Sequence, residues 1–452
     1  MTMTSSATKT IPNVPGSFLI GSLFPFLWNR FGFMERMSRD YGEIARLKIG
    51  PLSLVFINSA ELFQDLMVER INDFEKGELQ ARVFRPVLGN SLNIAEGQGH
   101  RKRRKLLAPV FQPRHLGSYA DTIVAFTDKA QRSWANHTTF ELFETLQNLA
   151  LEIMGKLLFD YDSFDQTDPF WQAVITATGY LDYQFTHPVT LPLSWPTPYN
   201  RRVRSQLALL NSRIYSLIKQ RRADSQKDQG DLLSKLLECK YEDGTSIDDL
   251  ELRNDIMFTL IAGYDNTSAA LAWTFYLLTQ NPDAYLKLQQ EVDEVLGERV
   301  ATYADLPQLT YTTQVFKEAL RLYPVSSLVA RVAKTKTQLG AYPIRKGEMV
   351  VLSPLVFHRH PDIYAQPEKF EPERFSPENE RKIPRYAYLP FGLGPRTCIG
   401  NHFSMIEGVL LIATLTKAIT VELIPGQQIV PVPKEVLRTK YGIQVRVNRR
   451  TK

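Results

Sequence analysis

One short segment near the C-terminus combines residues that could bind a metal. It runs from Phe391 to Gly400 as Phe-Gly-Leu-Gly-Pro-Arg-Thr-Cys-Ile-Gly, so Cys398 stands in a glycine-rich loop two residues after Arg396. Glycines let the backbone turn sharply and pass close to a flat ring system. A helix-like run begins near Asn401, and its positive end would stabilise a thiolate. The segment therefore predicts a cysteine thiolate on one face of a haem iron, with Arg396 placed to meet a propionate.

Two other interpretations of Cys398 have less support. A free cysteine is often buried as a small apolar side chain, but the glycines and the arginine around Cys398 disfavour that here. A zinc site requires further cysteines or histidines at short spacing. His402 follows four residues later and no further pair accompanies it, so a zinc site is also disfavoured.

The fixed positions of this loop resemble the haem-binding signature of the cytochrome P-450 family, Phe-x-x-Gly-x-Arg-x-Cys-x-Gly. Every fixed position is matched, by Phe391, Gly394, Arg396, Cys398 and Gly400. A match at all fixed residues with fixed spacing is specific. The resemblance implies a soluble, bacterial-type haem-thiolate monooxygenase. It would bind haem b (iron protoporphyrin IX) through Cys398 and use dioxygen as a co-substrate.

Two charged motifs upstream support the resemblance. Glu318 and Arg321 match the family's Glu-x-x-Arg, and Pro-Glu-Arg-Phe, with Arg374 at its third position, matches a second family motif. Residues three apart share one face of a helix, so an acid and a base at this spacing can pair. The resemblance implies that Glu318, Arg321 and Arg374 form a buried structural triad that fixes the position of the cysteine loop.

A polar segment interrupts the longest apolar stretch of the chain. It reads Ala-Gly-Tyr-Asp-Asn-Thr-Ser from Ala262 to Ser268 and resembles the family's Ala-Gly-x-Asp/Glu-Thr-Thr/Ser. One interpretation is a helix kink, with a hydroxyl bonded back to a carbonyl four residues earlier. The interpretation that the resemblance favours is catalytic: Asp265 would deliver protons toward dioxygen, assisted by Asn266 or Thr267.

Asn266 departs from the family pattern, which usually has threonine at that position. A hydroxyl donates and accepts through one oxygen, whereas an amide has separate donor and acceptor atoms. Two alternatives to a monooxygenase stay open. One is a haem-thiolate peroxygenase or rearranging enzyme without external electrons, which Asn266 favours and Asp265 disfavours. The other is a non-catalytic haem-binding protein.

Four basic residues match positions that contact the haem propionates in the family. His100 and Arg104 fit an aromatic-x-x-x-Arg pattern, and their offset of four puts them on one face of a predicted basic helix. Arg331 and Arg396 match the other two positions. Arginine suits a carboxylate because its guanidinium can bond both oxygens at once.

The remaining cations of the basic helix are expected to face outward. They are Arg101, Lys102, Arg103 and Lys105. The resemblance implies that they dock an acidic ferredoxin or flavodoxin-type electron donor at the end of an external NAD(P)H-dependent reductase chain. No Gly-x-Gly-x-x-Gly fingerprint is present, and no nucleic-acid-binding pattern accompanies the cations. His358 and His360 match a family turn that binds no metal, so both are interpreted as structural.

Several apolar positions are expected to contact a small apolar substrate, such as a fatty acid, terpenoid or polyketide. By position in the family pattern, Val325–Val329 should line the pocket and Ala262 should face the iron, while the loop 75–97 and a helix over Phe170–Phe185 should close it. The residues proposed for this role are Phe84, Leu92, Tyr180, Tyr183, Phe185, Ala262, Val325 and Leu328. Aromatic residues at such spacing are also common in ordinary cores.

The composition fits a large globular protein. The chain has 452 residues, 44% hydrophobic and 23% charged, without repeats or a low-complexity linker. We expect a monomer with one domain over residues 1–452, of which 1–11 are flexible. The two cysteines, Cys239 and Cys398, lie far apart, which is typical of a reducing cytoplasm. The apolar run 17–28 is too short to span a bilayer, so no transmembrane anchor is expected.

The spacing of apolar residues predicts a mainly α protein with a smaller β component, as the resemblance also implies. The resemblance further implies that the haem lies between the long central helix and the helix after the cysteine loop. A hairpin is predicted around Gly50-Pro51 within 42–57 and a loop over 75–97. Helices are predicted over 59–67, from Gly99 to Pro109, and over 116–160, 198–223, 231–237, 247–278, 282–297, 305–322 and 400–418. Strands are predicted at 349–353 and within 419–447.

Overall fold

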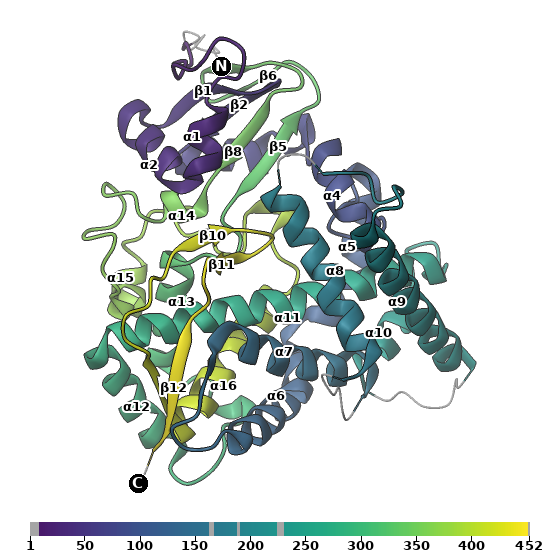
Figure 1. The fold of residues 1–452 in the computed structure, drawn as a ribbon, viewed down its shortest axis with the longest axis vertical. Coiled ribbons are helices and arrows are strands. Elements are labelled where there is room, and N and C mark those ends of the chain that lie inside the picture. Colours follow the sequence, from purple (N-terminus) through teal and green to yellow (C-terminus); the bar gives the residue numbers. More distant parts are fainter. Residues whose placement is uncertain (1–8, 162–166, 188–189, 224–229, 451–452) are drawn as a thin grey trace. The chain divides into compact units, whose positions relative to one another are not determined.

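The computed structural model describes residues 9–161, 167–187, 190–223 and 230–450, and this chain forms two compact units (Figure 1). The first unit comprises residues up to 80 with 320–369 and 377–398, and the second comprises 81–319, 370–376 and 399–452. Residues 1–8 of the segment expected to be flexible lie outside the described ranges. Ile11, at its end, is buried in the core of the first unit.

A five-stranded sheet organises the first unit. Its strand order is β1 (Ile44–Ile49), β2 (Leu52–Ile57), β8 (Met349–Leu352), β5 (Val329–Ala333) and β3 (Phe74–Glu75). The predicted hairpin is confirmed: β1 and β2 pair antiparallel from Ile44 opposite Ile57 to Ile49 opposite Leu52. A separate antiparallel pair consists of β6 (Thr337–Leu339) and β7 (Tyr342–Ile344).

Short helices complete the first unit. They are α1 (Leu23–Trp28), α2 (Arg30–Tyr41), α3 (Ala60–Gln64), α14 (Pro354–Phe357) and α15 (Pro377–Glu380), with a π turn at Asp65–Glu69 and 3-10 turns at Ile71–Asp73 and Gly394–Arg396. Ser59 begins α3 because its hydroxyl accepts the N–H of Leu62. One apolar cluster, which includes Phe63, Leu66 and Phe357, fills the space between sheet and helices.

The second unit is mainly helical. Its helices are α4 (Glu78–Leu88), α5 (Gly97–Leu107), α6 (Pro113–Ser133), α7 (Leu142–Phe159), α8 (Pro169–Thr186), α9 (Pro198–Ala223), α10 (Leu232–Glu238), α11 (Asp249–Gln280), α12 (Pro282–Leu296), α13 (Thr310–Leu322) and α16 (Asn401–Ala418), where α4 and α13 each cross a unit boundary. Its 3-10 turns are Ala108–Phe111, Tyr303–Asp305 and Pro372–Phe375.

Two small sheets complete the second unit. One has the order β4 (Thr139–Glu141), β12 (Gln444–Arg449) and β9 (Ile419–Leu423), and the other is the β10 (Pro431–Pro433) and β11 (Leu437–Thr439) hairpin. Both β12 pairings and the hairpin are antiparallel. Trp273 of α11 ties the hairpin to the helical core, because its indole N–H donates to the carbonyl of Leu437 at 2.8 Å.

The long helix α11 forms the core of the second unit. Asp248 caps it by accepting the N–H of Glu251 at 2.7 Å. A Cβ atom on Gly263 would lie 2.5 Å from the sulfur of Met154 on α7, so a side chain at residue 263 would require the side chain of Met154 to move. The helix is continuous from Asp249 to Gln280, and within its polar segment the hydroxyl of Ser268 donates to the carbonyl of Asp265 at 2.9 Å.

The main differences from the predicted elements have local causes. The loop predicted over 75–97 was wrong in part, because Glu78–Leu88 is a helix that contains Pro86. The helix predicted over 116–160 is two helices, which β4 separates. In the described ranges, none of the helices combines the length and hydropathy that crossing a membrane requires.

Candidate active site

Cys398 lies in a tightly bonded loop of the first unit. Its N–H donates to the carbonyl of Phe391 at 2.9 Å, and the hydroxyl of Thr397 donates to the carbonyl of Gly394 at 2.8 Å. Gly394 has a φ of +67°, and a Cβ atom there would lie 2.3 Å from the carbonyl oxygen of Met67. The loop therefore admits no side chain at this glycine.

The two cysteines differ in exposure. Cys398 is exposed, whereas Cys239 is half-buried, and the thiol of Cys239 donates to the carbonyl of Lys235 at 3.2 Å. Burial raises the pKa of Cys239 to about 11, so this thiol stays protonated at neutral pH. One exposed sulfur, in a loop where Gly394 admits no side chain, fits the single axial thiolate of a haem.

Glu318 and Arg374 form an ion pair within the second unit. The Oε1 atom of fully buried Glu318 accepts the N–H of Glu371 at 3.0 Å and lies 3.5 Å from Nε of Arg374. Arg374 also bonds the carboxylate of Glu371 at 3.0 Å. The carboxylate of Glu318 thus anchors the segment 370–376 to α13.

Arg321 bonds backbone carbonyls of the first unit. One NH group donates to the carbonyls of His358 and Pro367, each at 2.8 Å, and the other donates to Lys369 at 3.2 Å. The Nε2 atom of His358 accepts the N–H of Leu389 at 2.9 Å. Burial lowers the pKa of His358 to about 3, so this histidine is neutral and holds the backbone before the cysteine loop.

A partly exposed stripe interrupts the burial of α11. Phe258, Ala262 and Asn266, four residues apart, are only partly buried, whereas Asp265 and Thr267 are buried. Residues four apart lie on one face of a helix. Asn266 therefore shares a face with Ala262, while its neighbours Asp265 and Thr267 point elsewhere.

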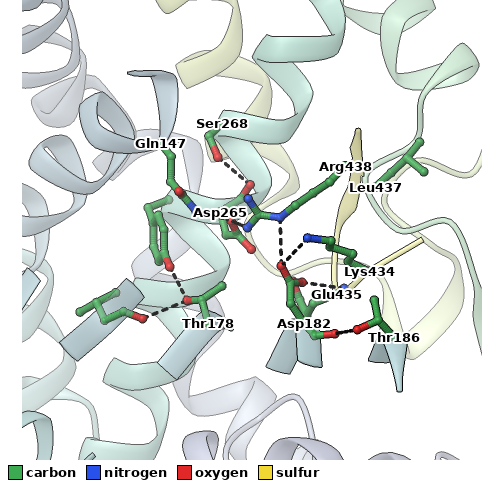
Figure 2. A network of polar contacts seen from close by, with 12 residues as sticks. Gln147, Thr178, Asp182, Thr186, Asp265, Ser268, Lys434, Glu435, Leu437 and Arg438 are labelled. Atoms are coloured by element: carbon green, nitrogen blue, oxygen red, sulfur yellow. Dashed lines mark hydrogen bonds and ion pairs between the residues drawn. The ribbon is translucent and has the colours of Figure 1, made fainter. Parts of the chain in front are cut away.

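Asp265 belongs to a buried network that joins four elements (Figure 2). Its Oδ1 atom accepts hydrogen bonds from Gln147 of α7 at 2.9 Å and from the guanidinium of Arg438 of β11. Nε of Arg438 lies 3.3 Å from Asp182 of α8. Burial raises the pKa of Asp265, and the charge of Arg438 opposes that rise.

Thr267 contacts a second buried acid. Its hydroxyl donates to Oε2 of Glu407 on α16 at 2.7 Å, and Glu407 is fully buried. Burial raises the pKa of Glu407 to about 8, so this carboxyl is neutral near pH 7. The three residues of the predicted catalytic segment thus have different surroundings: a charged network at Asp265, a partly exposed face at Asn266 and a neutral acid at Thr267.

One expectation about the basic helix, α5, is wrong. Arg103 was expected to face outward but is 4% exposed. It pairs with Asp255 at 2.8 Å and donates to the carbonyl of Asn90 at 2.6 Å. The helical period turns this cation inward, whereas Arg101, Lys102 and Lys105 are exposed.

The residues expected at the propionates lie in both units. His100 is buried and Arg104 partly buried on α5 of the second unit. In the first unit, Arg331 of β5 is 6% exposed and donates to the carbonyl of Ala330 at 2.7 Å, while Arg396 is partly buried.

The residues expected at the substrate are likewise divided. In the second unit, Phe84 packs edge-on against Phe185, with ring centroids 5.6 Å apart. Tyr183 stacks on His187 at 4.0 Å. Leu92 is buried, and its N–H donates to Asp255. Tyr180 is also buried, and Ala262 lies on the partly exposed stripe. Val325 and Leu328, both partly buried, belong to the first unit.

Sequence reasoning did not identify several polar residues of the networks. These are Gln147, Asp182, Glu407, Glu435 and Arg438. Each lies far along the chain from its partner: 173 residues separate Arg438 from Asp265, and 140 separate Glu407 from Thr267. A buried acid inside the apolar helix α16 was the one signal that could have indicated Glu407.

The comparisons with known proteins all indicate the same family. The family model described as Cytochrome P450 matches residues 12–447. Cyclooctatin synthase of Streptomyces melanosporofaciens is 33% identical over 87% of this chain and 86% of its own length. Cyclooctat-9-en-7-ol 5-monooxygenase of the same organism is 31% identical over 92% and 91%. Pentalenene oxygenase of Streptomyces avermitilis is 29% identical over 99% of both chains.

The fold has a solved counterpart. The crystal structure of the cytochrome P450DA heme domain superposes with a TM-score of 0.89 at 25% identity, and the match covers 99% of this chain and 98% of the other.

Proposed function

Because this chain belongs to the cytochrome P450 family and is a P450 monooxygenase, we propose that it hydroxylates or epoxidises a small apolar organic substrate with electrons from a separate donor. The observation that carries the proposal is the Cys398 loop. It has every fixed residue of the family signature, and it presents an exposed sulfur. The family implies haem and dioxygen.

In this proposal, each residue of the haem site has one role. The thiolate of Cys398 would bind the haem iron, and the propionates would be held by His100, Arg104, Arg331 and Arg396. The bound haem supplies reductive activation of dioxygen, in which a thiolate ligand favours cleavage of the O–O bond. The sharp turn at Gly394 holds the sulfur in place.

Protons reach the reacting oxygen from α11. Asp265 is the acid that delivers them, and Gln147 and Arg438 hold its Oδ1 atom. Asn266 lies on the same partly exposed face as Ala262, so its amide hydrogen-bonds dioxygen or a water. Thr267 bonds Glu407, which supports a positioning role for its hydroxyl.

The electron donor is an acidic ferredoxin or flavodoxin-type protein that an NAD(P)H-dependent reductase reduces. The exposed cations of α5, Arg101 and Lys102, support this choice because they complement negative charge.

The substrate is apolar and of terpenoid, fatty acid or polyketide type. The residues proposed to contact it, among them Phe84, Leu92 and Leu328, are mostly apolar. The names of two relatives contain an unsaturated alcohol, cyclooctat-9-en-7-ol, and pentalenene. These names favour an alkene or alcohol of the terpenoid class as the first compounds to test.

The haem ligand can be tested by spectroscopy. Reduced protein with carbon monoxide should show the red-shifted haem band of a thiolate ligand. Cys398→Ser should lose this band, and the matched control Cys239→Ser should keep it. Loss of the band in Cys239→Ser instead would overturn the assignment.

The reaction class needs a second measurement. A panel of apolar compounds is screened for the spin-state shift that accompanies loss of water from the iron, and each hit is turned over with a reductase or with peroxide. Product with the reductase supports the monooxygenase. Product with peroxide alone would favour the peroxygenase or rearranging enzyme, which Asn266 makes the second candidate.

A further inference from the structure

The two carboxylate oxygens of Asp265 differ in their hydrogen bonds: among the described residues, one has donors and the other has none. Oδ1 accepts from both Gln147 and Arg438. Oδ2 is buried, and no hydrogen bond reaches it from any described residue. Asp265 itself is 0% exposed. A carboxylate that gives up protons repeatedly must be recharged, and both donors on Oδ1 are poor sources because arginine does not deprotonate in proteins and an amide is not acidic.

A third acid lies in the same network. Glu435, in the turn of the β10–β11 hairpin, donates its N–H to Oδ1 of Asp182 at 3.2 Å, and Figure 2 shows it beside that residue. The network contains the acids Asp182, Asp265 and Glu435 but only the cations Lys434 and Arg438. Arg438 contacts Asp265 and Asp182, and Lys434 lies 3.7 Å from Asp182.

The cations are therefore committed to the two aspartates. For the carboxyl of Glu435, the described residues offer no ion pair. An acid near two carboxylates and without its own cation favours the neutral form. Burial and the charges of Asp265 and Asp182 together raise the pKa of Glu435 to about 8, against the opposing charge of Arg438.

We propose that Glu435 is a positioning acid that holds a proton beside the network and recharges Asp265 during turnover. The inference rests on the proposed function of Asp265. The proton leaves the carboxyl of Glu435, which becomes a carboxylate, and arrives at Oδ2 of Asp265, which becomes a neutral acid, directly or through one water. Glu435 is partly exposed, so it regains a proton from solvent. One proton moves inward each time the relay operates, which is twice per turnover because the oxygen atom that is not inserted leaves as water and consumes two protons, and no electron moves through the relay.

The groups that face Glu435 set the expected pH dependence. They are Asp182 on α8, Asp265 on α11 and Arg438 on its own hairpin, and the nearby titratable groups of the same elements are Tyr264, next to Asp265, and Lys434, next to Glu435 in the chain. Burial raises the pKa of Tyr264 well above its ordinary value, so the tyrosine stays neutral, and both cations stay charged. Loss of the Glu435 proton above about pH 8 should therefore slow turnover.

The experiment uses the haem-loaded protein with the isosteric variant Glu435→Gln, the conservative variant Glu435→Asp, and Glu422→Gln, an exposed glutamate of β9, as the matched control. Infrared difference spectra between pH 7 and pH 9 should show a protonated-carboxyl band in the wild type and in Glu422→Gln. Glu407 also has a pKa of about 8 and contributes to the band, so Glu435→Gln should weaken the band and not remove it. Its presence there with unchanged intensity would overturn the assignment of the proton.

Turnover tests the recharging step. With a reductase, Glu435→Gln should be roughly tenfold slower, less than the 10²-fold typical of losing a direct general acid, and should show a larger solvent isotope effect. Glu435→Asp should recover part of the rate. The peroxide-driven rate should not change, because peroxide brings its own protons. A reductase-driven rate and isotope effect equal to wild type would reject the relay.

The two proposals fail in different ways. If the wild-type protein gave no product with the reductase or with peroxide, the proposed function would be rejected. The infrared band would still show whether Glu435 holds a proton. A wild-type protein that turns over, with no effect of Glu435→Gln, would reject the relay alone.

Discussion

Neighbouring residues of α11 have different surroundings although they are consecutive in the chain. Asp265 enters a charged network, Asn266 lies on the partly exposed face with Ala262, and Thr267 bonds a buried acid on α16. The 100° turn per residue of a helix separates them. Their chemical roles can therefore be tested separately by substitution.

Asp265 and Asn266 should respond differently to substitution. Asp265→Asn removes the proposed acid, so reductase-driven turnover should fall by about 10²-fold or more. Asn266→Thr restores the usual hydroxyl and should keep turnover or improve coupling, whereas Asn266→Ala should release more peroxide. The measurement is product and peroxide formed per reduced cofactor consumed. Normal turnover of Asp265→Asn with a reductase would remove the proton-delivery role and strengthen the peroxide-using alternative.

Glu407 should make the protein less stable as the pH rises. Its pKa is about 8 in the folded protein against an ordinary value of 4.5, so the folded state retains a proton that the unfolded state loses above pH 4.5. The contribution of Glu407 to the free energy of unfolding is fully present below pH 4.5. It is lost as the pH rises to 8, and the loss is on the order of a few kcal/mol.

The matched variant isolates this contribution. Glu407→Gln keeps the shape and cannot ionise, so its stability in denaturant should depend less on pH between 4.5 and 8. Equal pH slopes for the two proteins would show that Glu407 titrates normally when folded.

At the scale of elements, local pattern predicted the helices better than the loops. The period of apolar residues predicted α9, α11, α12 and α16 closely, because each buries a continuous face. Helix α4 was missed because Pro86 and its polar residues are typical of a loop. The helical period could have indicated that Arg103 points inward, but its partner Asp255 is 152 residues away in the chain, so local pattern could not indicate this ion pair.

Glu318 connects α13 to the segment 370–376. Glu318→Ala would leave Arg374 without this carboxylate, and breaking a buried ion pair costs about 3–5 kcal/mol. We expect a lower melting temperature and poor haem retention. Glu373→Ala, which removes an exposed pair with Lys287, is the control and should change stability by less than about 1 kcal/mol. Equal behaviour of the two variants would contradict a structural role for Glu318.

The two glycines of the cysteine loop provide a second test. Gly392 and Gly394 both have positive φ, +72° and +67°. A Cβ atom on Gly394 would clash with the carbonyl oxygen of Met67 at 2.3 Å, whereas one on Gly392 would lie 3.9 Å from the carbonyl oxygen of Arg396, an ordinary contact. Gly394→Ala should therefore lose more haem and more stability than Gly392→Ala, in which strain acts alone. Haem content and melting temperature measure the difference. A greater loss in Gly392→Ala would show that the clash at Gly394 is relieved by movement of the loop.

At the scale of the whole molecule, the charge of the chain bears on its partner. The net charge is +6, and the exposed cations of α5 are the part that we propose for docking. Attraction between exposed charges is screened over about 10 Å at 0.1 M salt. Reduction by an acidic donor should therefore slow as salt rises.

Substitution separates docking from catalysis. Arg101→Glu with Lys102→Glu should weaken reduction further and leave the peroxide-driven rate unchanged, whereas Lys219→Glu, exposed on α9, should have little effect. Arg103 is unsuitable for this test because it is buried against Asp255. A reduction rate that does not depend on salt would exclude electrostatic docking at α5.

The contact between Gly263 and Met154 has a consequence for laboratory evolution of selectivity. If residue 262, on the partly exposed face of α11, faces the substrate as we propose, a larger side chain there should shift which carbon is oxidised. At residue 263, the first added methyl group meets the Met154 sulfur, and overpacking of this kind costs roughly 1–3 kcal/mol. A saturation library across both codons should return diverse, folded variants from the first and almost only the parent residue from the second.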